Sequence, residues 1–185
     1  MKTTFPYLII ILIFNFNYSI AQSVTHTLPK APKDYSWKTL SDINAYLLLP
    51  DGWFFNAEQK GTTYAYFVTK EDYTKDPNGM FVTGVSINVF TDIGNNNAVD
   101  YANSFANNLE NNNKVLFFGD YDNSVFKGKM LRIQTDDQII HYLVFGNTKT
   151  NKLYIVFFES SIAKWKENEE YGKTIMTLLA FDPEY

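Results

Sequence analysis

Apolar and polar positions alternate with a period of two between residues 81 and 90. The mostly apolar set is Phe81, Thr83, Val85, Ile87 and Val89, and the intervening positions include a glycine, a serine and an asparagine. Side chains of a strand point alternately to its two faces, so this pattern predicts a strand with one buried side.

Six more segments rich in β-branched and aromatic residues predict further strands: 44–50, 62–70, 115–118, 126–135, 139–145 and 153–159. Turns are expected at Pro50-Asp51-Gly52 and at Asp76-Pro77-Asn78-Gly79. The last two strands are apolar on both faces, so both of their faces must be covered. Their short connection, 146–152, favours an antiparallel hairpin.

Helical spacing occurs twice. Asn97 is suited to cap a helix in which Ala98, Ala102, Phe105 and Leu109 recur, and the pattern ends at residues 111–113. A second helix is expected near the C-terminus, with the acidic residues Glu167, Glu169 and Glu170 at its start, where negative charge complements the helix dipole. Its apolar stripe is Tyr171, Ile175, Leu178 and Leu179, and Phe181 and Pro183 mark its end. The expected fold is α+β: a central antiparallel sheet flanked by helices on both faces, an α/β/α sandwich.

The first 21 residues have the pattern of a cleavable export signal. Lys2 precedes the apolar run 7–14, and small residues at 19–21 precede Gln22. Asn15 and Asn17 interrupt the run well short of the about 20 residues that a membrane span needs. We expect a signal peptide at 1–21, a flexible lead-in at 22–34 and one domain at 35–185. The mature protein is expected to be extracytoplasmic, periplasmic or secreted, without an integral membrane segment.

The amino-acid composition restricts the classes of binding partner and site that this protein is expected to have. The chain carries a net charge of −4, has no cysteine, and contains a single arginine, Arg132. Nucleic-acid binding requires clustered cationic residues, so a nucleic-acid partner is not expected. Without cysteine there are no disulfides, thiol nucleophiles or thiolate metal sites, and stability must come from packing.

Three segments resemble the PsbP-like family, which has the Mog/PsbP fold. They are YLLLPDGW at 46–53, NKLYIVF at 151–157 and the helix expected at 165–181. The resemblance extends over about residues 36–181. It implies an antiparallel sheet sandwiched by helices and a mainly non-enzymatic role. Members act as accessory or binding subunits, one in a photosynthetic membrane complex and another bound to a small GTPase. The leader argues against the GTPase role for this chain.

No catalytic constellation stands out. His26 lies in the lead-in, and His141 shares a strand face with Ile139, Leu143 and Phe145, which favours a packed histidine over a proton carrier. Neither a Gly-x-Ser-x-Gly elbow nor a His-Glu-x-x-His pair is present. A Ser-His-Asp hydrolase with dispersed residues stays open, because such residues are often far apart in sequence.

Metal and cofactor sites are not expected either. Asp120 and Asp122 alternate with Tyr121 and Asn123 in a pattern that suits a weak calcium site, but such residues are also common in solvated turns, and a hairpin turn is the favoured interpretation. No cofactor is predicted.

Aromatic residues offer the remaining binding surface. Most of them are expected in the core, while five are potential contacts in a cleft or interface: Trp53, Phe54, Tyr64, Tyr66 and Tyr121. Trp53 is also suited to brace the bend after Pro50. The leading hypothesis is therefore an exported, non-catalytic binding or accessory domain that engages a protein or cell-envelope component. The alternative is a small-ligand-binding protein with an aromatic cleft.

Overall fold

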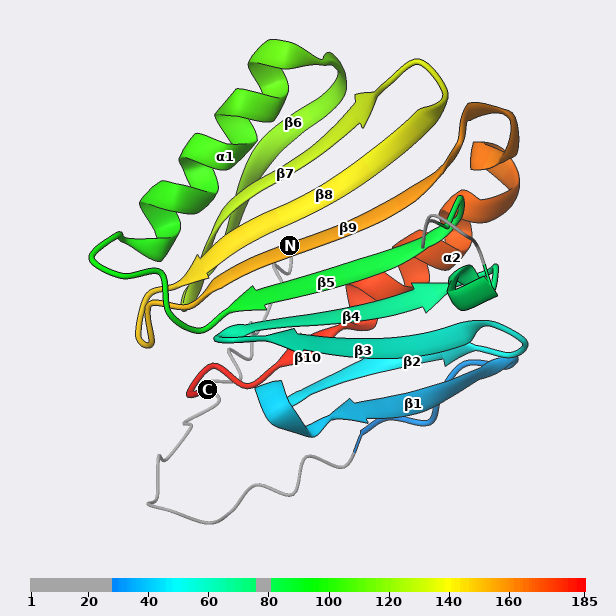
Figure 1. Cartoon of the computed structure of the whole chain (residues 1–185), viewed down its shortest axis with the longest axis horizontal. Coiled ribbons are helices and arrows are strands. Elements are labelled where there is room, and N and C mark those ends of the chain that lie inside the picture. Colours follow the sequence, from blue (N-terminus) through cyan, green and yellow to red (C-terminus); the bar gives the residue numbers. More distant parts are fainter. Residues whose placement is uncertain (1–27, 76–80) are drawn as a thin grey trace, which may run out of the picture.

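The largest element of the protein is an antiparallel sheet of seven strands (Figure 1). The computed structural model describes residues 28–75 and 81–185. The strands follow the spatial order β3 (Phe54–Lys60), β4 (Thr63–Thr69), β5 (Gly84–Phe90), β9 (Leu153–Ser161), β8 (Gln138–Asn147), β7 (Phe126–Gln134) and β6 (Lys114–Asn123). The hairpin predicted between 139–145 and 153–159 is confirmed as β8 paired with β9.

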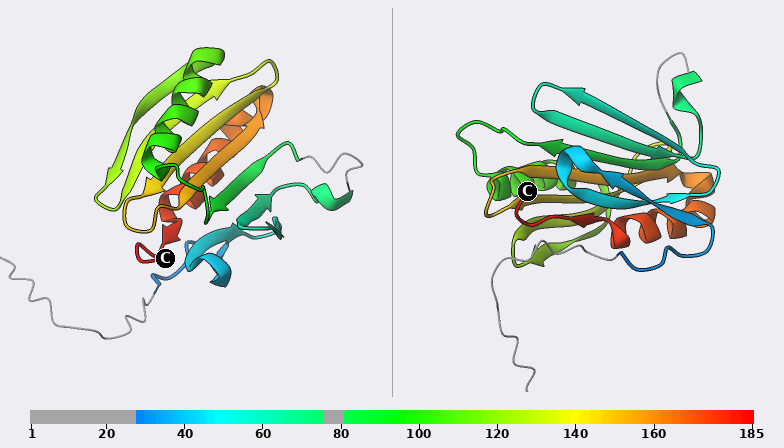
Figure 2. Two further views of the ribbon diagram at one scale, coloured as in Figure 1. Left: turned by 60° about the vertical axis from the view of Figure 1, so that its left-hand side comes forward. Right: turned by 90° about the horizontal axis from the view of Figure 1, so that it is seen from below.

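A smaller sheet contains β1 (Tyr35–Leu40), β2 (Ala45–Pro50) and β10 (Ala180–Phe181), in the order β1-β2-β10. Figure 2 shows β1 and β2 lying beside β10 and the helix that precedes it. The sequence did not predict this sheet, because β1 is largely exposed and β10 has two residues. The segment 44–50, expected in the central sheet, pairs here instead.

Helix α1 (Ala98–Asn112) begins at the predicted cap. The side chain of Asn97 accepts hydrogen bonds from the backbone N–H groups of Val99 and Asp100, which otherwise have no partner in a helix. Its small residues Ala98, Ala102 and Ala106 are buried and let the helix lie close to β7 and β8.

Helix α2 (Trp165–Leu178) contacts β9, β5 and β2. It ends before the predicted Phe181, which belongs to β10. Three short 3₁₀ turns complete the described elements: η1 (Ser41–Ile43), η2 (Tyr73–Lys75) and η3 (Ile162–Lys164). None of the helices within 28–75 and 81–185 has the length and apolar character that crossing a membrane requires.

The core consists of two clusters that use alternate residues of β8 and β9. One contains Phe145, Tyr154, Val156 and Phe158 with Val85, Ile87 and Val89 of β5, and the other contains Ile140, Val144, Leu153 and Ile155 with the α1 alanines. Both faces of these strands are therefore covered, as their apolar pattern predicted. The α+β class and the central antiparallel sheet are confirmed.

Some predictions differ from the structure or lie outside it. β3 was not predicted, because its mostly exposed sequence FFNAEQK lacks an apolar alternation. Residues 120–123 were expected in a hairpin turn, but they belong to strand β6. The turn begins at the next residue, Ser124, whose backbone has a left-handed conformation. The signal peptide, His26 and the turn at 76–79 lie outside the described residues.

Candidate functional site

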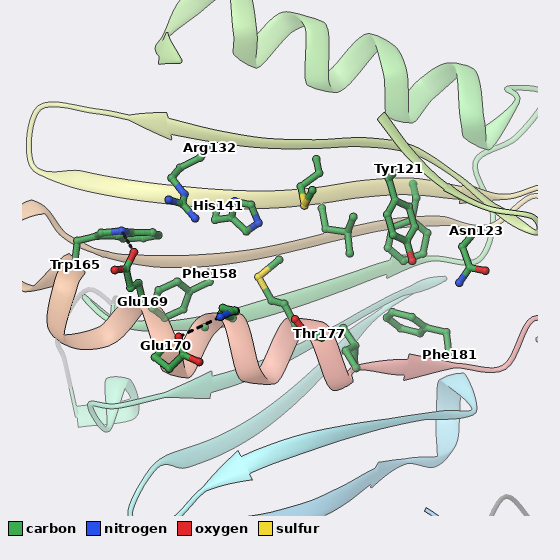
Figure 3. Close-up of a pocket in the computed structure, with 17 residues that line it drawn as sticks. Tyr121, Asn123, Arg132, His141, Phe158, Trp165, Glu169, Glu170, Thr177 and Phe181 are labelled. Atoms are coloured by element: carbon green, nitrogen blue, oxygen red, sulfur yellow. Dashed lines mark hydrogen bonds and ion pairs between the residues drawn. The ribbon is translucent and has the colours of Figure 1, made fainter. Parts of the chain in front are cut away.

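A groove of about 720 Å³ lies between α2 and the sheet (Figure 3). It is partly apolar and large enough for a small molecule. Its residues come from six elements: Tyr121 and Asn123 of β6, Met130 and Arg132 of β7, His141, Leu143 and Phe145 of β8, Phe158 of β9, Trp165, Glu169, Glu170, Gly172, Lys173, Met176 and Thr177 of α2, and Phe181 of β10, with Leu179 between α2 and β10.

Strand register arranges the floor of the groove in rows that run across the sheet. Arg132 is paired with His141, which is paired in turn with Phe158. Two residues along, Met130 is paired with Leu143. Residues two apart on a strand share a face, so these rows lie side by side on one surface.

The next row of the floor is aromatic. Tyr121 is paired with Gly128, and Gly128 with Phe145. The rings of Tyr121 and Phe145 lie 5.3 Å apart across the glycine, and the ring of Phe181 lies 5.7 Å from that of Phe145. The floor is therefore polar at the Arg132–His141 pair and apolar at Phe145, which lies four residues after His141 in β8.

The wall of the groove is one face of α2. Trp165, Glu169, Lys173 and Met176 recur every three or four residues, the spacing that places side chains on one side of a helix. Gly172 has no side chain, which lets α2 approach the ring of Phe158 closely. Figure 3 shows Trp165 and Glu169 at the end of the groove that also contains Arg132 and His141, and Tyr121, Asn123 and Phe181 at the other end.

Arg132 has no carboxylate partner within the described part of the chain. Its guanidinium Cζ lies 5.0 Å from the centroid of the Trp165 ring, a cation–π contact. Its Nε is buried and has no hydrogen-bond partner among the described residues. Buried donors of this kind are normally satisfied, so the guanidinium has unused capacity for an acceptor.

His141 presents a second unsatisfied nitrogen beside it. Its Nδ1 is buried and has no hydrogen-bond partner among the described residues. Burial, and secondly the charge of Arg132, lower the pKa of His141 to about 4. The imidazole is therefore neutral near pH 7. The sequence predicted a packed histidine rather than a proton carrier, and His141 is indeed largely buried, while its Nδ1 lacks a hydrogen-bond partner among the described residues.

The acidic residues of the wall have partners of their own. Glu169 accepts a hydrogen bond of 2.8 Å from Trp165 Nε1. Glu170 lies 3.5 Å from Lys173 Nζ. The polar end thus contains the Arg132 guanidinium without an ion-pair partner, and the Glu169 carboxylate, whose contact is the neutral indole N–H of Trp165.

The five aromatic residues proposed from the sequence lie in different places. Tyr121 lines the groove. Trp53 packs against Tyr171 of α2 with ring centroids 5.2 Å apart and ring planes tilted by 34°, which holds the bend after Pro50 against the helix. Tyr66 is buried, Tyr64 packs on the same core cluster, and Phe54 is 39% exposed on β3. Only Tyr121 is brought to the groove, and a binding role for the other four stays a prediction.

Asp120 and Asp122 are each paired across the β6–β7 hairpin. Asp120 bonds Lys129, and Asp122 lies 3.4 Å from Lys127. Within residues 28–75 and 81–185, no group of three or more side chains is placed to hold a metal ion. Both carboxylates are therefore engaged with lysines of β7.

Sequence reasoning missed the groove as a site. Two signals pointed toward it: Arg132 is the sole arginine, and His141 was placed on the face that includes Leu143 and Phe145. On α2 the stripe through Ile175 was recognised, while the neighbouring stripe through Trp165, Glu169 and Met176 was not. That stripe alternates apolar and charged residues and has no apolar signal of its own.

Comparison with known proteins gives structural matches alone. No family model and no curated protein matches the chain. The fold is similar to the solution structure of cyanobacterial PsbP from Synechocystis, with 13% identity over 89% of this chain and 98% of that chain, and a TM-score of 0.45. It is also similar to the Ran-binding protein Mog1p of Saccharomyces cerevisiae, with 12% identity over 80% of this chain and 95% of that chain, and a TM-score of 0.46. Both matches are to the PsbP-like and Mog1 fold that the sequence resembles.

Proposed function

We propose that this protein is an exported, non-catalytic binding domain and that the groove beside α2 is its binding site. The groove itself carries the proposal: a concave site of about 720 Å³ that combines apolar side chains with a smaller number of polar and charged ones. Ligand sites commonly combine these features. We therefore favour a small-ligand-binding protein, the alternative drawn from the sequence, and propose that its ligand is a component of the cell envelope.

The arrangement of the two helices supports this choice of surface. We infer that α1 and α2 cover opposite faces of the large sheet, because α1 packs with Ile140 and Val144 of β8 while the groove contains His141 and Leu143. α1 covers β7 and β8 on its side. α2 lies over β9 and β5, so β7 and β8 stay open along the groove.

A non-catalytic role is supported by the state of His141. A general base works best with a pKa near the operating pH. Burial and Arg132 hold the pKa of His141 at about 4, which makes it a weak base in neutral solution. Its position is better suited to hydrogen bonding with a bound molecule.

Binding is tested with a variant that fills the groove. Met130 is half-buried on the floor, and Met130→Trp places a large ring there. The purified protein is incubated with a small-molecule extract of a bacterial envelope, and retained compounds are identified by native mass spectrometry. We expect compounds that the wild type retains and Met130→Trp does not. Equal retention by both proteins, or conversion of a retained compound into a product, would contradict the proposal.

Export is tested separately. The full chain is expressed with its own N-terminus in a bacterium, and the N-terminal residue of the extracytoplasmic product is determined. We expect Gln22, because cleavage follows the small residues 19–21. Retention of the uncleaved chain in the cytoplasm would refute export without affecting the binding site.

A protein partner is the second candidate, and one observation favours it. Leu116 and Phe117 are 45% and 44% exposed on β6, an edge strand of the large sheet. Exposed apolar side chains on a strand edge are suited to contact with another protein. Cross-linking in intact cells tests this form: Leu116→Lys should abolish the cross-linked species and Met130→Trp should retain it.

A further inference from the structure

We propose that the groove binds a small amphiphilic carboxylate, with its carboxylate at Arg132 and His141 and its apolar chain along Met130 and Leu143 toward Phe145. This inference rests on the proposed function, because it assigns the ligand of the same groove. It names a chemical class that neither the sequence nor the comparisons indicate.

The polar end selects the head group. Arg132 and His141 are direct cross-strand partners, and each has a buried nitrogen without a hydrogen-bond partner among the described residues. A carboxylate has acceptors for both nitrogens, and its pairing with a guanidinium through two parallel hydrogen bonds is among the stronger polar contacts in proteins. The Trp165 ring holds one face of the guanidinium and leaves its edge for the ligand.

The charges around this end favour an anion over a cation at Arg132. The charged groups of the groove are Arg132, Glu169, Glu170 and Lys173. Glu170 is paired with Lys173, and Glu169 is hydrogen-bonded to the Trp165 ring nitrogen. Arg132 and Glu169 are therefore the groove charges without an ion-pair partner among the described residues, and Arg132 is the cation of the two. A neutral head group would leave it unneutralised, and an ammonium would be repelled by it.

The remaining floor selects the tail. From His141 to Phe145 the groove follows four residues of β8, which is about 13 Å at the usual rise of a strand. An extended acyl chain of about ten carbons has this length, since C–C bonds are about 1.5 Å and zigzag along the chain. The Met130–Leu143 row offers flexible apolar contacts midway. The rings of Tyr121, Phe145 and Phe181 close the far end, where Asn123 is the polar neighbour.

The experiment compares three probes that share a ten-carbon chain: decanoate, decan-1-ol and decylamine, each below its micelle concentration. Binding to the purified mature protein is measured by titration calorimetry at pH 7.5. We expect decanoate to bind about tenfold or more tightly than decan-1-ol, because charge-assisted hydrogen bonds are worth that factor or more. Decylamine should bind most weakly. Equal affinity for decanoate and decan-1-ol would refute carboxylate recognition, and tighter binding of decylamine would transfer the polar role to Glu169.

Matched variants locate the head group. Arg132→Met should lower decanoate affinity about tenfold or more, to the level of decan-1-ol, and leave decan-1-ol unchanged. Lys129→Met removes one positive charge from the same strand, but Lys129 pairs with Asp120 outside the groove, so decanoate affinity should stay within twofold. Equal losses in the two variants would show a general charge effect and overturn the proposal. Arg132→Lys keeps the positive charge but lacks the planar guanidinium, and it replaces Arg132→Met as the test variant if Arg132→Met does not fold.

A spectroscopic readout reports the same contact independently of affinity. The imidazole signal of His141 is followed by NMR as a function of pH with and without decanoate, and the His141→Gln spectrum assigns it. A bound carboxylate near Nδ1 favours the protonated ring, so the pKa of His141 should rise on binding. An unchanged titration with decanoate bound would place the head group elsewhere.

Failure of this inference is separable from failure of the proposed function. If no ten-carbon probe binds but envelope compounds are retained by the wild type and lost in Met130→Trp, the groove is a binding site for another class of ligand. If neither the probes nor envelope compounds bind, both proposals are refuted.

Discussion

Gly172 of α2 lies directly against the ring of Phe158 in β9. A Cβ at position 172 would overlap the ring atoms, so the absence of a side chain sets the distance between helix and sheet. This contact forms the closed side of the groove. The same glycine interrupts the helical stripe that forms the wall.

Replacement of this glycine gives the first prediction. Gly172→Ala should destabilise the protein by about 2 kcal/mol, because overpacking costs more than the better helix propensity of alanine returns. Urea unfolding measures the change. In a double-mutant cycle, Phe158→Leu should relieve part of the loss, giving a coupling between the two positions. Additive losses would mean that the ring is not the obstacle.

A buried polar cluster joins α2 to the sheet and gives the second prediction. Asn168 is 1% exposed, donates to Ser160 Oγ at 3.0 Å and accepts from Lys70 Nζ at 2.9 Å. Asn168→Ala leaves these groups without their partner and should cost about 1–3 kcal/mol. Asn107→Ala, at an exposed position of α1, is the control and should be neutral or slightly stabilising. Equal unfolding midpoints for the two variants would contradict this role.

Glu159 gives a third prediction, on pH. Burial, and secondly Asp137, raise its pKa from 4.5 to about 7. The folded protein therefore holds the proton more tightly than the unfolded chain. The resulting contribution to the free energy of unfolding is full below about pH 4.5 and is lost as the pH rises through 7. Glu159→Gln should gain thermal stability relative to the wild type across this range, by about 2–4 °C for each kcal/mol. A difference in Tm that does not vary from pH 4 to 8 would refute this assignment.

His141 gives a fourth prediction with the opposite slope. Its pKa is about 4 in the folded protein and 6.5 as the ordinary value, so the unfolded chain takes up a proton first as the pH falls. The stabilising contribution is present above pH 6.5 and is lost as the pH falls toward 4. His141→Gln, made in the Glu159→Gln background to remove the opposing slope, should reduce this loss. Unfolding curves at pH 4 to 7 measure it, and parallel pH profiles with and without His141 would contradict the prediction.

Much of the architecture was predictable because it is encoded in local patterns. The alternation through Val85, Ile87 and Val89 gave a strand, and Asn97 with the alanines after it gave α1, since periods of two and 3.6 are properties of neighbouring residues. β3 lacked such a pattern because it is an edge strand with mostly exposed side chains. β10 was too short to have a pattern.

Asparagine illustrates what local patterns do not contain. The side chain of Asn151 accepts a hydrogen bond from the N–H of Ala98 and donates one to the carbonyl of Asn96, which joins the β8–β9 hairpin to the start of α1. Asn147 donates to the carbonyl of Pro183 near the C-terminus. Such bonds join residues 36 to 55 positions apart, so only the folded chain reveals them.

The sequence by itself determined the α+β class, the paired apolar strands and the lone arginine. Tertiary structure decided that Arg132 lies beside His141 under Trp165, and that Tyr121 and Phe145 close the far end of the same groove. The physical reason is strand register. It aligns residues from four strands on one surface, and the packing of α2 against Phe158 adds the wall. Register is set by long-range pairing, which no local run of residues encodes.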